Sequence, residues 1–250
     1  MKTRDLIAYL DELLVPGEFK DYAPNGLQVE GRGEVNRIVL GVSASLGLIE
    51  AARERRADAV LVHHGWFWRG EDARITGVKG RRVRTLIESE MNLIAYHLPL
   101  DAHAEVGNNA ELARVLGLSI ESRTGEYGLL HTGSILSGPM RADAFAARVT
   151  EALGRAPLLV GDAGKTVARV GWCSGAAQDW IGEAAALGCD LYLSGEIREH
   201  TTFEAVELGI PYLAAGHTAT EQFGIQALGR RLSEAFPDLT IEFVPQENPA

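Results

Sequence analysis

The sequence predicts an α/β fold in which parallel-rich mixed sheets carry helices on both faces, as three-layer α/β domains do. Short apolar runs of strand length alternate along the chain with segments of helical periodicity, which is the pattern of such sheets. The run Ala59-Val60-Leu61-Val62 is apolar throughout, as expected for a strand buried on both faces. With 250 residues, of which 46% are hydrophobic, the chain is long enough for one large or two smaller cores.

The individual elements follow from these two patterns. An amphipathic helix follows directly after the charged N-terminus, and strands and helices then alternate. The expected strands are Arg37–Ser43, Ala59–His63, Asn92–His97, Val167–Cys173, Asp190–Ser194 and Pro211–Ala215. The expected helices are Leu6–Leu14, Gly47–Glu54, Gly80–Ser89, Ala110–Leu116, Arg141–Leu153, Asp179–Leu187, Thr201–Leu208 and Glu221–Ala235.

A change of composition near the middle of the chain predicts a domain boundary. Between Gly117 and Thr132, Ser, Thr and Gly accumulate and the helical periodicity lapses, so we place the boundary near Glu126. The prediction is an N-terminal α/β domain over residues 1–125 and a C-terminal α/β domain over residues 126–250, in which the alternation of strands and helices repeats. The last apolar run, Leu239–Val244, is expected to be an edge strand, either of the first domain's sheet or of the second's.

Charge and composition exclude several classes of protein. The 24 basic and 34 acidic residues give a net charge of −10, which argues against a nucleic-acid partner. The charged N-terminus shows no cleavable secretory signal, and no apolar stretch reaches the roughly 18 residues of a membrane span. Cys173 and Cys189 are expected to be buried, reduced thiols. We therefore expect a cytoplasmic protein without a membrane partner.

Three segments place metal-binding side chains after strands or at helix starts. They are His63-His64, the segment from His97 to Asp101, and the segment from His217 to Glu221. Parallel sheets bind ligands at the carboxyl edge of their strands, so these side chains are expected to share such an edge.

Each segment also has a simpler interpretation. His63 and His64 can be a polar strand end, and neighbours on an extended chain point to opposite sides, which favours two ions over one. Asp101, expected in a loop after Pro99, can cap a turn. Thr218 and Glu221 have the spacing of a helix capping box, although the helix dipole would also favour an ionised Glu221.

Taken together, the segments supply five nitrogen and oxygen ligands. That number is too large for one catalytic zinc with an open position, but it suits two ions that share a carboxylate. Mixed imidazole and carboxylate ligation admits zinc, iron, manganese, nickel or cobalt. The expected cofactor is therefore a pair of divalent metal ions per chain.

With these residues in place, the chain resembles the Nif-three-like family of dinuclear metal proteins, whose bacterial members are called GTP cyclohydrolase I type 2 homologues. The resemblance covers essentially the whole chain. It rests on Asn25-Gly26-Leu27-Gln28-Val29-Glu30-Gly31, His63-His64-Gly65, Tyr96-His97 with Asp101, Gly107-Asn108-Asn109, Ser194-Gly195-Glu196 with His200, and Gly216-His217 with Thr220-Glu221.

The resemblance implies a ligand set, an architecture and an assembly. The metal ligands it implies are His63, His64, Asp101, His217 and Glu221, with Glu221 as the bridge between the ions. It also implies two similar α/β domains with the metal site between them, and a ring-shaped homohexamer. One departure is that many members have proline after the paired histidines, where this chain has Gly65 followed by Trp66-Phe67-Trp68.

The predicted function is metal-assisted hydrolysis, of the GTP cyclohydrolase type or on phosphoesters or amides, acting on a small, nucleotide-like molecule. His97 is the candidate for proton transfer or ligand orientation, with a backbone-satisfied strand end as the alternative. Glu196 and His200 either bind substrate or cap the next helix. Trp66 and its aromatic neighbours either stack on a planar ligand or form a hydrophobic interface.

A second hypothesis uses the same ligands without catalysis. In it the protein is a metal-dependent binding or regulatory protein, and the ions organise a cavity or a partner surface. Identical ligands serve both hypotheses, so the sequence does not separate them.

Overall fold

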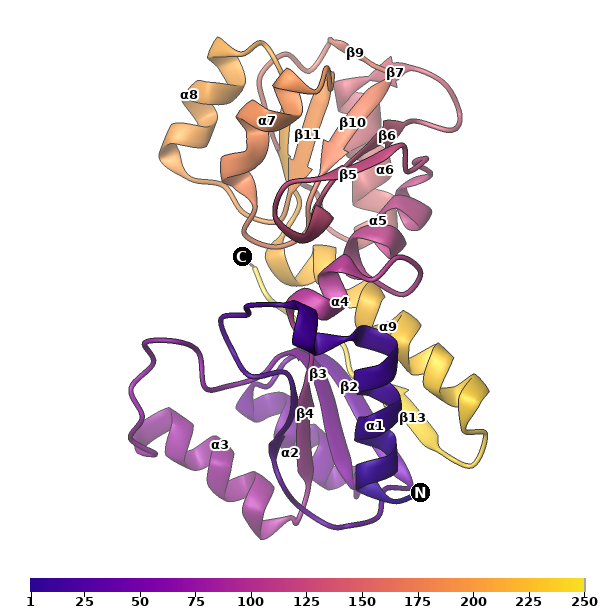
Figure 1. The fold of residues 1–250 in the computed structure, drawn as a ribbon. Helices are drawn as coiled ribbons and strands as arrows, with labels where there is room; N and C mark the ends of the chain where they lie inside the picture. Colours follow the sequence, from indigo (N-terminus) through magenta and orange to yellow (C-terminus); the bar gives the residue numbers. More distant parts are fainter. Residues whose placement is uncertain (250) are drawn as a thin grey trace. The chain divides into compact units, whose positions relative to one another are not determined.

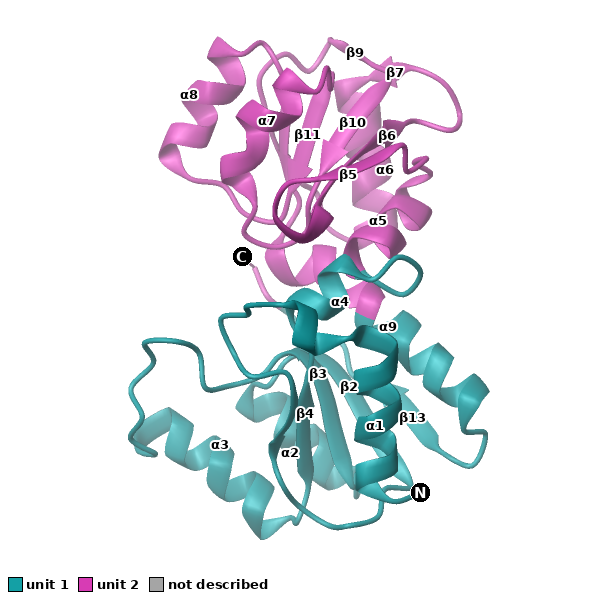
Figure 2. Ribbon diagram, in the orientation of Figure 1, with its two compact units in different colours: residues 1–107, 225–247 teal, residues 108–224, 248–250 magenta. Residues whose placement is uncertain are grey.

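The computed structural model describes residues 1–249, which form two compact units (Figures 1 and 2). The first unit contains residues 1–107 and 225–247, and the second contains residues 108–224 with Asn248 and Pro249. These units differ from the predicted division at residue 126 because α5 (Asn108–Leu116) buries Leu112 and Leu116 in the core of the second unit. The chain also returns to the first unit near its C-terminus.

The first unit is built on a five-stranded sheet in the order β1-β4-β3-β2-β13. Its elements are α1 (Thr3–Leu14), a 3₁₀ turn η1 (Pro16–Glu18), β1 (Gly26–Val29), β2 (Arg37–Ser43), α2 (Leu46–Glu54), β3 (Ala59–His64), α3 (Gly77–Glu88), β4 (Asn92–Ala95), α4 (Leu98–Ala102), the later part of α9 (His217–Ala235), and β13 (Thr240–Phe243). β4, β3, β2 and β13 run parallel, and β1 pairs antiparallel with β4. The C-terminal strand thus belongs to the first sheet.

Helices cover both faces of this sheet. In β3, Leu61 packs into one core with α1 and the later part of α9, whereas its neighbours Val60 and Val62 pack into another core with α2 and α3. This alternation is the two-residue period of a strand buried on both faces. The fully apolar β3 therefore lies in the middle of the sheet and delivers His63 and His64 to its carboxyl edge.

The second unit is built on a six-stranded sheet in the order β5-β6-β10-β11-β12-β8, with a separate pair formed by β7 and β9. Its elements are α5, β5 (Ser122–Thr124), a 3₁₀ turn η2 (Glu126–Gly128), β6 (Leu130–Ser134), β7 (Met140–Arg141), α6 (Ala142–Leu153), β8 (Leu158–Val160), β9 (Thr166–Val167), β10 (Arg169–Trp172), a 3₁₀ turn η3 (Gln178–Trp180), α7 (Ile181–Ala186), β11 (Leu191–Ser194), α8 (Glu199–Glu207), β12 (Tyr212–Ala214) and the start of α9.

In this sheet β10, β11 and β12 are parallel, and the outer strands are antiparallel. α5 and α6 pack on the face that carries Leu193 and Leu213, while α7 and α8 pack on the face that carries Tyr192 and Tyr212. Each unit is thus a mixed sheet between helices, as the alternating pattern predicts.

Every predicted strand and helix core is present, and most differences are small shifts of element ends. The short antiparallel strands β1, β5, β6 and β8 were not predicted, because their runs are too short or too polar to stand out. Both cysteines are buried thiols, as expected. No helix within residues 1–249 has both the length and the apolar character needed to span a membrane.

His131 in β6 makes the second unit sensitive to acid. Its side chain is almost completely buried, its Nδ1 lies 3.1 Å from the Leu129 carbonyl oxygen, and its ring centroid lies 5.5 Å from that of Trp172. Burial, with a smaller contribution from the charge of Arg123, lowers the pKa of His131 to about 4, against the opposing effect of its hydrogen bond. The folded protein therefore resists protonation that the unfolded chain accepts.

We expect this histidine to contribute stability above pH 6.5 that is lost as the pH falls from 6.5 to about 4. The lost contribution is about 3 kcal/mol. Urea unfolding at several pH values checks this, because the His131→Phe variant should lose stability less steeply than the wild type in that window. Parallel profiles for the two proteins would contradict the assignment.

Candidate metal centre

The first group of donor residues lies at the carboxyl edge of the first sheet. His63 is fully buried at the end of β3, with Nδ1 3.0 Å from the Tyr96 carbonyl oxygen and Nε2 3.4 Å from Asp101 Oδ1. The His63 and His64 ring centroids are 4.4 Å apart. The expectation that the two rings point to opposite sides is therefore wrong: pairing with β4 stops at Val62, so the chain at His64 is held only on its β2 side.

His97 joins the paired histidines from the end of the next strand. His63, His64 and His97 each offer a ring nitrogen, and the three nitrogens lie within 4.8 Å of one another. The Trp68 ring stands edge-on to His97 at a centroid distance of 5.0 Å and lies 5.9 Å from His64. Three imidazoles, two at the end of β3 and one just after β4, thus form one compact cluster.

Asp101 is buried beside this cluster in the short helix α4, not in the loop that the sequence predicted. Pro99 stands in the first turn of that helix, where its missing N–H costs nothing. The helix begins right after His97, and the hydrogen bond from the Asp101 N–H to the His97 carbonyl belongs to its first turn. Asp101 therefore presents its carboxylate to His63 instead of capping a turn.

Asp21 holds His97 from a loop that precedes β1. Its Oδ1 lies 2.7 Å from His97 Nδ1, and its side chain is only 4% exposed. Burial by itself would raise the pKa of Asp21, but hydrogen bonds from His97 and Asn25 and the attraction to His97 outweigh it and lower the pKa to about 2. The carboxylate is therefore ionised across the ordinary pH range.

The second donor group lies at the carboxyl edge of the second sheet. His217 follows β12 at the start of α9, with Nε2 3.1 Å from Glu221 Oε2 and Nδ1 2.7 Å from Glu196 Oε1. Burial alone would lower the pKa of His217, but the two carboxylates overcome this and raise it to about 9. A pocket that favours an extra proton so strongly is one that stabilises positive charge.

Glu221 does not serve the capping box that the sequence suggested. α9 begins at His217, so Thr218 already lies inside the helix, and the Thr220 hydroxyl donates to the carbonyls of Gly216 and His217. The Glu221 side chain is only 4% exposed, and its carboxylate pairs with His217 one turn earlier. The residue is thus a buried acid beside an imidazole.

All four imidazoles share one feature of their hydrogen bonding. Each Nδ1 meets an oxygen: the Tyr96 carbonyl for His63, the Ser43 hydroxyl for His64, Asp21 for His97 and Glu196 for His217. A carbonyl or carboxylate can only accept, so the Nδ1 that faces it carries the proton. For His63, His97 and His217, Nε2 is then the nitrogen that can bind a metal ion or a proton, as in metal sites with oriented histidines. The Ser43 hydroxyl can donate or accept, so its contact orients the His64 ring and allows either tautomer.

The remaining predicted residues have different surroundings. Glu196 orients His217, so its carboxylate belongs to the second donor group. His200 is half exposed on α8 and hydrogen-bonds to Asp179 instead of to a donor residue. Trp66 is 4% exposed and its indole N–H donates to Ala44, so it belongs to the core and is not placed to stack on a ligand. Trp68, not Trp66, is the tryptophan whose ring lies beside His64 and His97.

Asp21, Ser43 and Trp68 were missed because no spacing rule connects them to the paired histidines. One signal existed for the loop that contains Asp21, since Asn25 and Gln28 belong to a recognised motif. Gln28 Oε1 accepts a hydrogen bond from the Trp66 N–H, which fixes the chain just after His64 and Gly65. The motif therefore positions the chain next to the histidines. Sequence patterns do not reveal this contact, because Gln28 and Trp66 are 38 residues apart.

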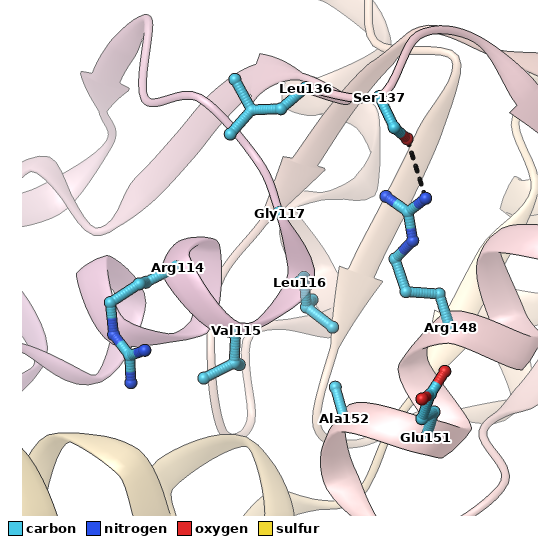
Figure 3. Close-up of a pocket in the computed structure, with 9 residues that line it drawn as sticks. All are labelled: Arg114, Val115, Leu116, Gly117, Leu136, Ser137, Arg148, Glu151 and Ala152. Atoms are coloured by element: carbon cyan, nitrogen blue, oxygen red, sulfur yellow. Dashed lines mark hydrogen bonds between the residues drawn. The ribbon is translucent and has the colours of Figure 1, made fainter.

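The second unit also has a shallow hollow of about 490 Å³ that contains none of these donor residues (Figure 3). It is lined by Arg114, Val115, Leu116, Gly117, Leu136, Ser137, Arg148, Glu151 and Ala152. Its two guanidinium groups are engaged, Arg114 with Glu111 and Arg148 with Ser137. The hollow has no imidazole or thiol, so we assign the chemistry to the two donor groups.

Comparisons with known proteins identify the family of the chain. The model of the family described as Duf34/NIF3 (NGG1p interacting factor 3) matches residues 1–249. A protein of Allochromatium vinosum named GTP cyclohydrolase 1 type 2 homolog is 52% identical over 99% of this chain and 97% of its own length. One of the same name from Pseudomonas aeruginosa is 50% identical over 98% and 97%.

Solved structures show the same similarity. A structural-genomics protein described as ybgI, of unknown function, superposes with a TM-score of 0.96 at 44% identity, covering 100% of both chains. A crystal structure of a Thermus thermophilus protein gives a TM-score of 0.87 at 34% identity, covering 100% of this chain and 99% of that one. On the family match and these full-length relatives, the chain belongs to the Duf34/NIF3 family.

Proposed function

We propose that this protein is a metal-dependent hydrolase that holds two divalent ions on His63, His64, Asp101, His217 and Glu221, with Glu221 shared by both ions. The observation that supports it best is that imidazoles fixed at Nδ1 stand beside buried carboxylates at the carboxyl edge of each sheet. In this proposal the two donor groups act as one site, as the family resemblance implies.

The residues present fit such ions. Imidazole nitrogens and carboxylate oxygens without a thiolate suit zinc, iron, manganese, nickel or cobalt. The raised pKa of His217 supports the fit, because it reports a pocket that favours a cation. Bound ions would polarise a substrate and lower the pKa of a water molecule enough for attack near neutral pH.

The side chains around the proposed ions divide the remaining work. His97, with Nδ1 held by Asp21, is the candidate to take a proton from the attacking water at Nε2 and return it to the leaving group. Trp68 provides a flat apolar surface beside His97 and His64 for a planar ligand. The name of the relatives makes a purine nucleotide such as GTP the first substrate class to test, followed by phosphoesters and amides.

Two further expectations accompany the proposal. The ring-shaped homohexamer implied by the resemblance stays a prediction, which size-exclusion chromatography with light scattering checks directly. A substrate-contacting role for His200 also stays a prediction.

Metal content tests the shared site. We expect wild-type protein reconstituted with a divalent metal to carry two ions per chain, and both His64→Ala and Glu221→Ala to lose most of that metal. Elemental analysis after desalting measures this, with Asp143→Asn, an exposed carboxylate paired with Arg141, as the control. Variants that keep full occupancy would contradict the ligand assignment.

Gly175 provides a second test of Glu221. It follows β10 with a φ of +64°, and an added Cβ would collide with Glu221 Oε1. We therefore expect Gly175→Ala to displace the carboxylate and lower metal content by at least half. Gly209→Ala is the matched control, since Gly209 also has a φ of +64° and its added Cβ would meet no atom within 4 Å. Equal metal content in both variants would show that Glu221 is not a ligand.

His97→Gln tests proton transfer. We expect kcat to fall by about 10²- to 10⁴-fold, because glutamine cannot accept the proton that the imidazole would accept. Metal content should be unchanged, because His97 is not one of the proposed metal ligands. Formate release from GTP and a panel of phosphoesters and amides provide the assay. Full metal loading without turnover of any substrate would instead support the non-catalytic binding protein.

A further inference from the structure

We propose that Asp21 is the positioning residue for His97: it holds the imidazole in one orientation and in the tautomer that leaves Nε2 unprotonated. The inference rests on the proposed function insofar as it gives His97 a proton to move. Its geometric part stands on the first unit alone and is open to a separate measurement.

The Asp21 carboxylate is surrounded by hydrogen-bond donors. The Tyr22 N–H lies 2.6 Å from Oδ1, while Asn25 Nδ2 and the Leu98 N–H lie 2.9 Å and 3.0 Å from Oδ2. An ionised carboxylate can only accept hydrogen bonds. The contact at 2.7 Å to His97 therefore requires a proton on Nδ1 of that ring. The lone pair of a neutral His97 is then on Nε2.

The same loop also fixes the backbone of His97. Asn25 Oδ1 accepts the His97 N–H at 2.8 Å, and its Nδ2 donates to Asp21. Asp21 in turn bonds both the ring of His97 and the N–H of the next residue, Leu98. Ring and backbone are thus fastened to one loop, which leaves little freedom for the ring to turn.

Aromatic neighbours limit the ring further. Trp68 approaches edge-on at 5.0 Å, Tyr22 at 6.4 Å, and the rings of His63 and His64 lie at 5.1 Å and 5.6 Å. A histidine that only filled space after a strand would not need these hydrogen bonds to its ring and backbone. Asp21 plays the part that the aspartate plays in a Ser-His-Asp triad, where it sets the tautomer of the histidine.

Asp21→Asn is the variant that separates positioning from simple anchoring. A carboxamide has one acceptor oxygen, so its NH₂ group must face either His97 and Tyr22 or Asn25 and Leu98. When the NH₂ group faces His97, the ring must accept at Nδ1, and the proton moves to Nε2. In a serine protease the equivalent change lowers kcat by about 10⁴-fold.

The first readout is histidine NMR of metal-free, ¹⁵N-labelled protein, with His97→Gln to assign the signal. We expect wild-type His97 to carry its proton on Nδ1, and the Asp21→Asn variant to gain a population with the proton on Nε2, in which the NH₂ group faces the ring. A wild-type ring protonated on Nε2 overturns the proposal, because such a ring does not donate to Asp21. The wild-type spectrum decides the point even if the variant does not fold.

The second readout is the loaded enzyme. We expect Asp21→Asn to lower kcat at least 100-fold, with KM changed less than about threefold and metal content as in the wild type. Asp143→Asn should leave all three unchanged. Loss of metal would show that Asp21 holds the ions instead. A rise in KM of about 100-fold with kcat unchanged would show that it holds the substrate. If the wild type turns over nothing, the proposed function fails while the tautomer still decides the geometric claim.

Discussion

The structure depends on hydrogen bonds that fix each imidazole of the donor groups at Nδ1. An imidazole that can turn freely offers either nitrogen in many directions, and ordering it costs free energy each time an ion binds. Here a backbone carbonyl, a hydroxyl and two carboxylates remove that freedom in advance. The result is a set of Nε2 atoms prepared for a cation, with Asp101 and Glu221 beside two of them.

The fold explains why these partners meet. In the first unit, parallel β2, β3 and β4 end at the same edge, so Ser43 and His64 at the ends of β2 and β3 meet His97, which follows β4. In the second unit, Gly175, Glu196 and His217 follow the ends of parallel β10, β11 and β12 in the same way. The apolar strands pack against helices on both faces, which leaves the carboxyl edge as the place where polar groups can gather. The apolar core and the donor residues thus occupy different parts of each sheet.

Sequence patterns predicted the framework well and the local geometry less well. The apolar run before His63 predicted the central strand, and the alternation of elements predicted the layers.

Asp101 was expected in a loop because Pro99 suggested a break, yet proline is tolerated in the first turn of α4. The sequence allowed Glu221 to be either a metal ligand or part of a capping box, and the capping box does not form because the helix begins one turn earlier. The sequence does not show that the core buries Trp66 and leaves Trp68 beside the histidines. Asp21 and His97 form a hydrogen bond although they are 76 residues apart in the sequence. Such choices depend on tertiary packing, which local patterns do not encode.

The central claim is that ions bind at the Nε2 atoms that these hydrogen bonds prepare. An anomalous-difference map from crystals of the metal-loaded protein tests it most directly. The account predicts two peaks, each within about 2.0–2.2 Å of an Nε2 atom of His63, His64 or His217, with every Nδ1 contact retained. Peaks bound through Nδ1, or peaks away from both donor groups, would contradict it.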